Sequence, residues 1–389
     1  MRFAHLSDTH LGNRQYGILE REEDYYEIFD KTIDKIIELD VDFVIHSGDL
    51  FDGQRPSTNT FLAFQRGLLK LNNAGIPIYA ISGNHDIVMR KGIKPPIDLF
   101  EELGLRILRH DNGFMEGDVF ICGVQFIPSS QKRVLDKILE RFSDEAKKHA
   151  KSIIVLHQGI KKFIDYGDDS YELELNELPE NFNYYAFGHL HNYIEEDWGK
   201  GKLIYPGSME VSKSNEIAQI NNKGFCVVDL SEDVPSIERI TIELSRRQCS
   251  KNIEYDKLYD ELEDLKSKIK GLDKKPLLHI SVFGGDSNSS DIHELIQDEL
   301  GKDTLNLRIS YTSDEGLNNN NLPENDILNP RRILKEKILE KYDDEDIANL
   351  SVDLMVNLSS KRIEDAKYLS DNYYEEHYSY SEEDIESDE

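Results

Sequence analysis

The sequence predicts an α/β protein built as a layered α/β/β/α sandwich, with a small second domain and a C-terminal helical segment. Short apolar runs alternate with helical periodicity through the first 245 residues. Later apolar runs in this region follow one another without helices between them, which indicates an antiparallel finish to the sheets. An αβαβ pattern then begins after residue 246 and predicts a separate small domain.

The expected strands of the first domain are short and rich in β-branched and aromatic residues. They cover residues 43–46, 76–81, 119–124, 152–156, 184–187, 203–205, 224–230 and 236–244. Apolar side chains at helical spacing predict two helices between them, one with Tyr26, Phe29, Ile33 and Ile36, the other with Phe61, Phe64, Leu68 and Leu71. The second helix also carries Leu62 and Leu69 outside its apolar stripe. These two leucines fit either a dimer contact surface or a helix packed on both sides.

The remaining chain divides into four segments. The second domain, residues 246–312, is expected to contain a helix at 254–269, a strand at 277–283, a helix at 291–300 and a strand at 305–312. Residues 313–326 lack periodicity and predict a flexible linker. Asn329 and Pro330 predict the start of a helical segment at residues 327–370 with apolar Ile333, Ile338, Leu350, Leu354 and Leu358. Residues 371–389 contain nine acidic residues and no Lys or Arg, so we expect a disordered tail.

The composition limits the class of protein. A chain of 389 residues with 38% hydrophobic residues supports two or three globular units. It shows neither a membrane-length apolar run nor a leader, so we expect a cytoplasmic protein without a membrane partner. The three widely spaced cysteines indicate neither a disulfide framework nor a thiolate metal site.

The net charge of −30 argues against a surface that binds nucleic acid over the whole molecule. Basic residues nevertheless follow two of the motifs described below, namely Arg90, Lys91 and Lys94 after one and Lys161 and Lys162 after another. These side chains fit phosphate contacts and an ordinary solvated surface about equally well. For nucleic-acid binding, the charge near these motifs therefore matters more than the net charge of the whole chain.

Five short polar motifs follow expected strands in the first domain. They are Asp8-Thr9-His10, Gly48-Asp49, Gly83-Asn84-His85-Asp86, His157 and Gly188-His189-Leu190-His191. Because strand C-termini in such sheets converge on one crevice, these residues are expected to meet there. Each motif alone is weak, but the ordered set of five is a strong signal. We assign no role to the remaining histidines, which are His5, His46, His110, His149, His279, His293 and His377.

The side chains in these motifs are ligands for divalent metals, since they offer carboxylate, carboxamide and imidazole groups. Residues i and i+2 of an extended chain point the same way, so Asp8 with His10 and His189 with His191 can each face one place. Seven such ligands are too many for one ion. With one bridging carboxylate, they suit two metals about 3.5–4 Å apart, the arrangement used for in-line phosphoryl displacement by water. No serine or cysteine nucleophile is then needed.

In this order, the motifs resemble those of the calcineurin-like metallophosphoesterase superfamily over residues 1–245. The stretches 7–12, 46–51 followed by 55–57, and 83–86 resemble a narrower group, the meiotic-recombination-eleven (SbcD-like) DNA repair nucleases of archaeal type. Protein phosphatases of the superfamily carry G-D-x-x-D-R-G as their second motif, which residues 48–55 do not match.

This resemblance implies a role for each site residue. One metal would be held by Asp8, His10 and His191, another by Asn84, His157 and His189, with Asp49 bridging both; manganese is the expected ion. His85 would protonate the leaving 3′ oxygen or stabilise its charge, as an imidazole with a pKa of ~6.5 can do at neutral pH. Asp86 either orients His85 or is a surface acid. Asp52 stands where many relatives have a second histidine, which leaves the role of that histidine open here.

The resemblance also implies partners. The small second domain would cap the active site and help to position duplex DNA, and the C-terminal helices would bind the coiled-coil base of an SMC-like ABC-type ATPase. The expected function is a manganese-dependent DNA exonuclease and endonuclease that acts as a homodimer on double- and single-stranded DNA ends in double-strand-break repair. The alternatives are a phosphodiesterase or phosphatase on small substrates and a non-catalytic scaffold for the ATPase. We expect the C-terminal segment to be dispensable for the chemistry, unless its helices fold back on residues 1–312.

Overall fold

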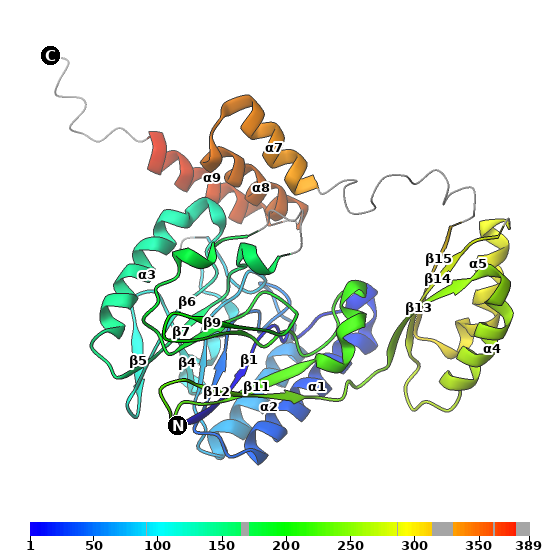
Figure 1. Ribbon diagram of the computed structural model, residues 1–389, viewed down its shortest axis with the longest axis horizontal. Helices are drawn as coiled ribbons and strands as arrows, with labels where there is room; N and C mark the ends of the chain where they lie inside the picture. Colours follow the sequence, from blue (N-terminus) through cyan, green and yellow to red (C-terminus); the bar gives the residue numbers. More distant parts are fainter. Residues whose placement is uncertain (91, 165–170, 286, 313–329, 361, 379–389) are drawn as a thin grey trace.

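Two six-stranded sheets form the centre of the first domain in the computed structural model (Figure 1). The structure describes residues 1–90, 92–164, 171–285, 287–312, 330–360 and 362–378. The first sheet has the order β12-β11-β1-β2-β3-β4, and its strands are β1 (Arg2–Leu6), β2 (Phe43–His46), β3 (Ile78–Ala80), β4 (Leu105–Ile107), β11 (Gly224–Asp229) and β12 (Ser236–Thr241). Strands β1 to β4 are parallel, whereas β11 and β12 are antiparallel.

The second sheet has the same mixed character. Its order is β5-β6-β7-β8-β10-β9, with β5 (Gly113–Glu116), β6 (Val119–Val124), β7 (Lys151–Leu156), β8 (Tyr184–Phe187), β9 (Ile194–Trp198) and β10 (Gly201–Tyr205). Strands β6, β7, β8 and β10 are parallel, and β5 and β9 are antiparallel edges. The sequence did not predict β4, β5 or β9, because each is a short strand near or at a sheet edge.

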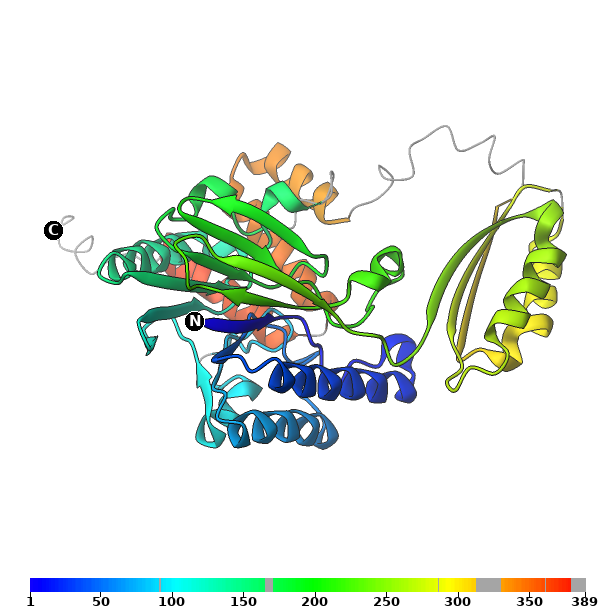
Figure 2. The ribbon, with the colours of Figure 1, turned by 60° about the horizontal axis from the view of Figure 1, so that its bottom comes forward.

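Helices cover the outer face of each sheet. Helices α1 (Leu19–Glu38) and α2 (Thr58–Asn73) pack on the first sheet, and α3 (Lys132–Ala146) packs on the second. A third apolar cluster lies between the sheets, where Phe3 and Phe43 stack with their ring centroids 4.8 Å apart. The predicted four-layer α/β/β/α sandwich is therefore confirmed. Figure 2 shows the helices and sheets as successive layers.

The small second domain contains one strand more than the sequence predicted. Its order is β13 (Gln248–Glu254), α4 (Leu258–Ile269), β14 (Leu277–Phe283), α5 (Ser289–Leu300) and β15 (Asn306–Thr312). The three strands are parallel, so the unit is βαβαβ rather than αβαβ. The prediction failed at β13 because that strand is mostly polar, with only Gln248 and Ile253 buried. The strand runs to Glu254 and a 3-10 turn (Tyr255–Lys257) follows it, so the helix begins at Leu258, four residues after the predicted start.

Buried charges attach the second domain to α1. Arg246 Nε donates to Asp24 Oδ2 over 2.6 Å, and Lys274 Nζ donates to Asp24 Oδ1 over 2.9 Å. Tyr16 Oη lies 3.0 Å from His279 Nε2, and the Arg308 guanidinium lies 4.8 Å from the centre of the Tyr16 ring. These contacts join the sheet side of the small domain to the N-terminal part of the first domain, and α4 and α5 lie on the far side (Figure 1).

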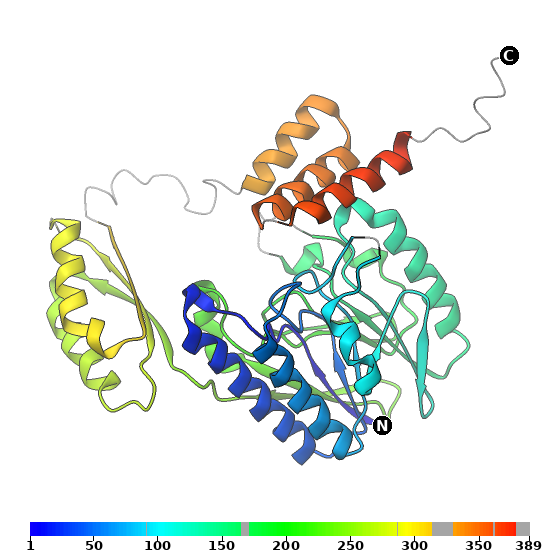
Figure 3. The same ribbon diagram turned by 180° about the vertical axis from the view of Figure 1, so that it is seen from behind.

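Three C-terminal helices pack on the first domain. They are α7 (Pro330–Tyr342), α8 (Glu345–Ser359) and α9 (Ile363–Tyr378), and they lie at the top of the first domain in Figure 3, whereas the second domain lies to its left. Pro330 opens α7 as predicted, while Asn329 and the predicted linker 313–326 lie outside the described residues. Arg133 Nη2 donates to Asp346 Oδ2 over 3.1 Å, and the backbone N–H of Ser130 donates to Asp353 Oδ2 over 3.2 Å. The helices thus fold back on the first domain.

The predicted boundary between helix and acidic tail at residue 371 is wrong. Helix α9 continues to Tyr378. The buried side chains of Ala366 and Leu369 anchor this helix, and the acidic residues that follow extend it on its exposed side. Residues 379–389 lie outside the described residues. Within the described residues, no helix is long and apolar enough to cross a membrane.

Candidate metal centre

All five motifs lie where strands of the two sheets end. Asp8 and His10 follow β1, Asp49 follows β2 and Asn84 follows β3, in three adjacent parallel strands of the first sheet. His157 follows β7, and His189 and His191 follow β8, in adjacent strands of the second sheet. The packing of one sheet on the other brings these ends together. The structure therefore gathers all seven predicted ligand side chains in one crevice.

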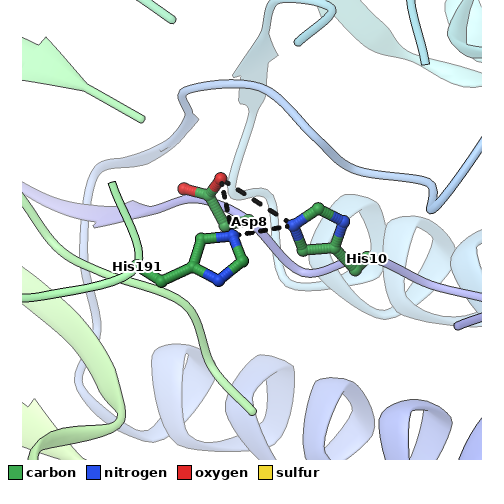
Figure 4. Close-up of side chains that lie close together, drawn as sticks. All are labelled: Asp8, His10 and His191. Carbon is green, nitrogen blue, oxygen red and sulfur yellow. Dashed lines mark hydrogen bonds and ion pairs between the residues drawn. The ribbon is translucent and has the colours of Figure 1, made fainter. Parts of the chain in front are cut away.

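One group of donor atoms consists of Asp8, His10 and His191 (Figure 4). His10 Nε2 lies 3.1 Å from His191 Nε2, and Asp8 Oδ1 lies 3.9 Å from the former and 3.7 Å from the latter. Asp8 and His10 are buried, whereas His191 is half-buried. These distances place one oxygen and two nitrogens around a single point, as a cation requires.

The second group consists of Asn84, His157 and His189. Asn84 Oδ1 lies 3.1 Å from His157 Nε2 and 2.8 Å from His189 Nδ1. The carbonyl oxygen of Ser47, which only accepts, lies 2.7 Å from His157 Nδ1. The Nδ1 atom therefore carries the proton, and a neutral His157 presents a lone pair from Nε2 to the Asn84 oxygen. Two facing acceptors at this distance need a proton or a cation between them.

Asp49 lies between the two groups. Its Oδ2 is 3.7 Å from His10 Nε2 and 3.3 Å from His157 Nε2, and its Oδ1 accepts a hydrogen bond of 2.8 Å from the His85 backbone N–H. No other described carboxylate lies within 4 Å of imidazole nitrogens from both groups. Asp49 is therefore placed to bind two ions at once.

A second layer of polar groups fixes the orientation of the imidazoles. Glu216, in the 3-10 helix η6 (Ser214–Asn222), lies with Oε1 2.8 Å from His191 Nδ1. Burial acts to raise the pKa of Glu216, but His191 and Lys223 outweigh it and hold that pKa well below its usual value. An ionised Glu216 holds the proton of His191 on Nδ1 and turns Nε2 toward Asp8. This carboxylate–imidazole pair is the usual support of a metal-binding histidine.

The backbone at the site has unusual conformations. Asp8, His10, Asp49 and His189 have φ values of 51°, 42°, 52° and 91°, in the left-handed region that residues with a β-carbon rarely adopt. Asp8 and His10 thus converge through left-handed turns rather than through the extended chain expected from the sequence. A β-carbon on Gly83 would collide with Asp49, and one on Gly188 would collide with the Ser47 carbonyl. Such strain is typical of functional sites.

The negative charge of the site raises the proton affinity of two imidazoles. Burial lowers the pKa of His10, but Asp52, Asp49 and Asp8 outweigh burial and raise it to about 9. Burial also lowers the pKa of His157, but the charge of Asp49 outweighs burial and raises that pKa to about 9. The centre therefore attracts positive charge, and protons and metal ions would compete for the same nitrogens.

His85 lies at the mouth of the site, with 44% of its side chain exposed. Its Nδ1 lies 3.2 Å from the Asp52 carbonyl oxygen and 3.8 Å from Asp52 Oδ1. The surrounding protein partly desolvates the imidazole and so lowers the pKa of His85, although Asp49 opposes this effect. His85 is thus next to the ligands, with its Nδ1 directed at Asp52 rather than at either ligand group.

Asp86 takes neither of the roles considered from the sequence. It is fully buried and accepts hydrogen bonds from the backbone N–H groups of Gly83, Leu50 and Phe51, so it ties together the loops after β2 and β3. The acid near His85 is Asp52, whose Oδ1 also lies 3.4 Å from His10 Nδ1.

Sequence reasoning missed the supporting residues Ser47, Glu216 and Lys223. None belongs to a ligand motif, and Glu216 lies 25 residues beyond His191 in a helix without a distinctive pattern. Their contacts depend on how the loops pack, so the sequence carries no local signal for them.

Comparison with known proteins agrees with this arrangement. A family model described as calcineurin-like phosphoesterase matches residues 1–193. A DNA double-strand break repair protein Mre11 from Methanococcus maripaludis is 35% identical over 356 residues, covering 88% of this chain and 90% of the relative. The chain belongs to the Mre11 family.

Further Mre11 relatives extend the similarity along the chain. The protein from Saccharolobus solfataricus is 33% identical over 386 residues, covering 93% of this chain and 96% of the relative. That from Methanocaldococcus jannaschii is 38% identical over 291 residues, covering 73% and 76%. The family predicted from the motifs, archaeal in type, is confirmed, and the similarity extends beyond the catalytic domain.

Proposed function

We propose that this protein is a two-metal, manganese-dependent DNA exonuclease and endonuclease that processes DNA ends in double-strand-break repair. The position of Asp49 between two groups of donor atoms is the observation that carries this proposal. Membership of the Mre11 family supports DNA as the substrate. Oxygen and imidazole ligands without thiolates suit manganese.

In this proposal, Asp8, His10 and His191 would hold one ion, Asn84, His157 and His189 would hold the other, and Asp49 would contribute to both. When bound, the two ions supply positive charge to the phosphodiester and activate water for in-line attack. The protein fixes the geometry through Glu216 on His191 and the Ser47 carbonyl on His157. Precise placement of the donor atoms is the main contribution that the chain itself makes.

His85 serves as the general acid. It is the exposed imidazole next to the ligands, so a leaving 3′ oxygen can approach it from the solvent side. The Asp52 carbonyl accepts a hydrogen bond from Nδ1, which directs the other ring nitrogen away from Asp52. Proton donation by a side chain in this position typically accelerates hydrolysis by roughly 10²–10⁴-fold.

One assay separates this function from its alternatives. Purified protein with manganese is incubated with end-labelled duplex DNA, circular single strands and a generic phosphodiester, each with and without chelator. Chelator-sensitive cleavage of both DNAs is expected. Cleavage of the generic ester alone would indicate a small-substrate phosphodiesterase, and no cleavage of any substrate would indicate a scaffold.

Partner surfaces are the less direct part of the proposal. Leu62 and Leu69 on α2 are 47% and 44% exposed, which rules out a helix packed on both sides and favours the dimer surface. On the C-terminal helices, Ile333 and Leu358 are 38% and 53% exposed and suit the coiled coil of an SMC-like ABC-type ATPase. The second domain, residues 246–312, would help to position duplex DNA.

Two paired substitutions test these surfaces. Leu62→Glu with Leu69→Glu should convert a dimer to a monomer in light scattering, while Ile333→Glu with Leu358→Glu should abolish co-purification with the ATPase and leave the dimer intact. Unchanged assembly in either variant contradicts the corresponding surface.

A further inference from the structure

Arg362, the residue before α9, reaches from the C-terminal helices to the metal centre. Its Nη1 donates to the backbone carbonyl of Asn84 over 2.8 Å, although 278 residues separate the two in sequence. Asn84 is one of the seven ligand side chains. The C-terminal helices therefore do more than cover the first domain, because they place a cation beside the reacting groups.

Arg362 lines an open cavity of about 620 Å³ together with His85, Asn84, Arg55 and Arg331. Pockets of ~300–1,000 Å³ accommodate ligands of nucleotide size. Three arginines line this cavity, and so do the acidic side chains of Asp52, Glu364 and Asp365. The cavity thus combines the proposed general acid with guanidinium groups that recognise phosphate oxygens.

The hydrogen bonding of Arg362 leaves donors available. Within the part of the chain that the structure describes, its guanidinium forms no salt bridge, and its buried Nε has no hydrogen-bond partner. The nearby Asp365 instead accepts a hydrogen bond of 2.5 Å from Gln54 Nε2. A buried donor without a partner is costly, so a ligand that supplies an acceptor would be favoured.

We propose that Arg362 is a phosphate-binding residue of the nuclease site, supplied by the C-terminal helices and directed at the phosphodiester in the cavity beside His85. This assignment rests on the proposed nuclease function and makes the C-terminal segment part of the substrate site. It replaces the expectation that this segment is dispensable for the chemistry.

The test compares Arg362→Gln and Arg362→Lys with a control, Arg133→Gln, in the full-length protein. Arg133 also joins the C-terminal helices to the first domain, through Asp346, but it does not line the cavity. In manganese-dependent cleavage of single strands, Arg362→Gln should lower kcat/KM about tenfold or more. The lysine variant should recover part of this loss, and Arg133→Gln should cleave like the wild type.

Binding without turnover gives an independent readout. The affinity for a labelled single-stranded oligonucleotide is measured by anisotropy at several salt concentrations in the presence of chelator. Loss of one phosphate contact should reduce the slope of log K against log salt by about 0.7 in Arg362→Gln, with no change in Arg362→Lys. The number and affinity of bound manganese ions should be the same in all variants.

Several results would overturn the assignment. Reduced manganese affinity in Arg362→Gln would mean that Arg362 acts only by positioning Asn84. Faster cleavage would mean that the helices are an inhibitory cover. Equal slopes and affinities, including no measurable binding by either protein, would exclude a phosphate contact. An inactive wild type would instead refute the nuclease function itself. The other outcomes named above concern only Arg362 and leave the nuclease function unaffected.

Discussion

Manganese binding should weaken steeply as the pH falls from 9 to 7. In the metal-free protein the pKa values of His10 and His157 are both about 9. Each imidazole belongs to a different proposed metal site, and each must lose its proton to bind an ion. Because the pKa values are raised, the protonated form dominates below pH 9, so protons oppose metal binding in that range.

The size of the effect follows from these two values. At pH 7 the pH lies two units below each pKa, so each site loses about 2.7 kcal/mol of metal-binding free energy, or about a hundredfold in affinity, relative to the fully deprotonated imidazole. Relative to pH 9, where each imidazole is half protonated, the loss is about fiftyfold. Binding of two ions at pH 7 should release about two protons from these imidazoles, and fewer as the pH approaches 9.

Calorimetry in buffers of different ionisation enthalpy measures this proton release. Asp52→Asn removes the largest contribution that raises the pKa of His10. The variant should therefore release fewer protons when manganese binds. It should also bind manganese more tightly than the loss of one negative charge alone would predict. Asp197→Asn, whose side chain is 81% exposed, is the control and should match the wild type. Proton release near zero at pH 7, or equal release from Asp52→Asn and the wild type, would refute the argument.

Three further predictions concern activity. Asp49→Ala should reduce hydrolysis more than Asp8→Ala, because Asp49 faces both groups of ligands; steady-state rates and metal counts test this, and full activity in Asp49→Ala would end the two-metal mechanism. His85→Ala should retain two manganese ions and lose roughly 10²–10⁴-fold in hydrolysis, whereas loss of metal would make His85 a ligand. Truncation after Thr312 should leave a folded dimer with impaired cleavage of single strands and no ATPase binding; wild-type kinetics would show that the C-terminal helices contribute nothing to the site.

Local patterns were enough to predict which side chains would meet at the site. Asp8, Asp49, Asn84, His157 and His189 each follow a buried apolar strand, and parallel strands of one sheet end at the same edge. The position of each residue relative to its strand therefore predicted that these side chains would meet. The alternation of apolar strands and amphipathic helices likewise predicted the four layers, because burial of apolar faces depends on short-range periodicity.

Only the tertiary structure revealed what supports and completes the site. The contacts of Glu216 with His191, of the Ser47 carbonyl with His157 and of Arg362 with Asn84 join segments 25, 110 and 278 residues apart. No periodicity or spacing encodes such contacts, since they depend on how loops from two sheets and a distant helical segment pack. The sequence by itself determined which groups would meet at the ends of the strands, and long-range packing decided how they are oriented and which cation lies beside them.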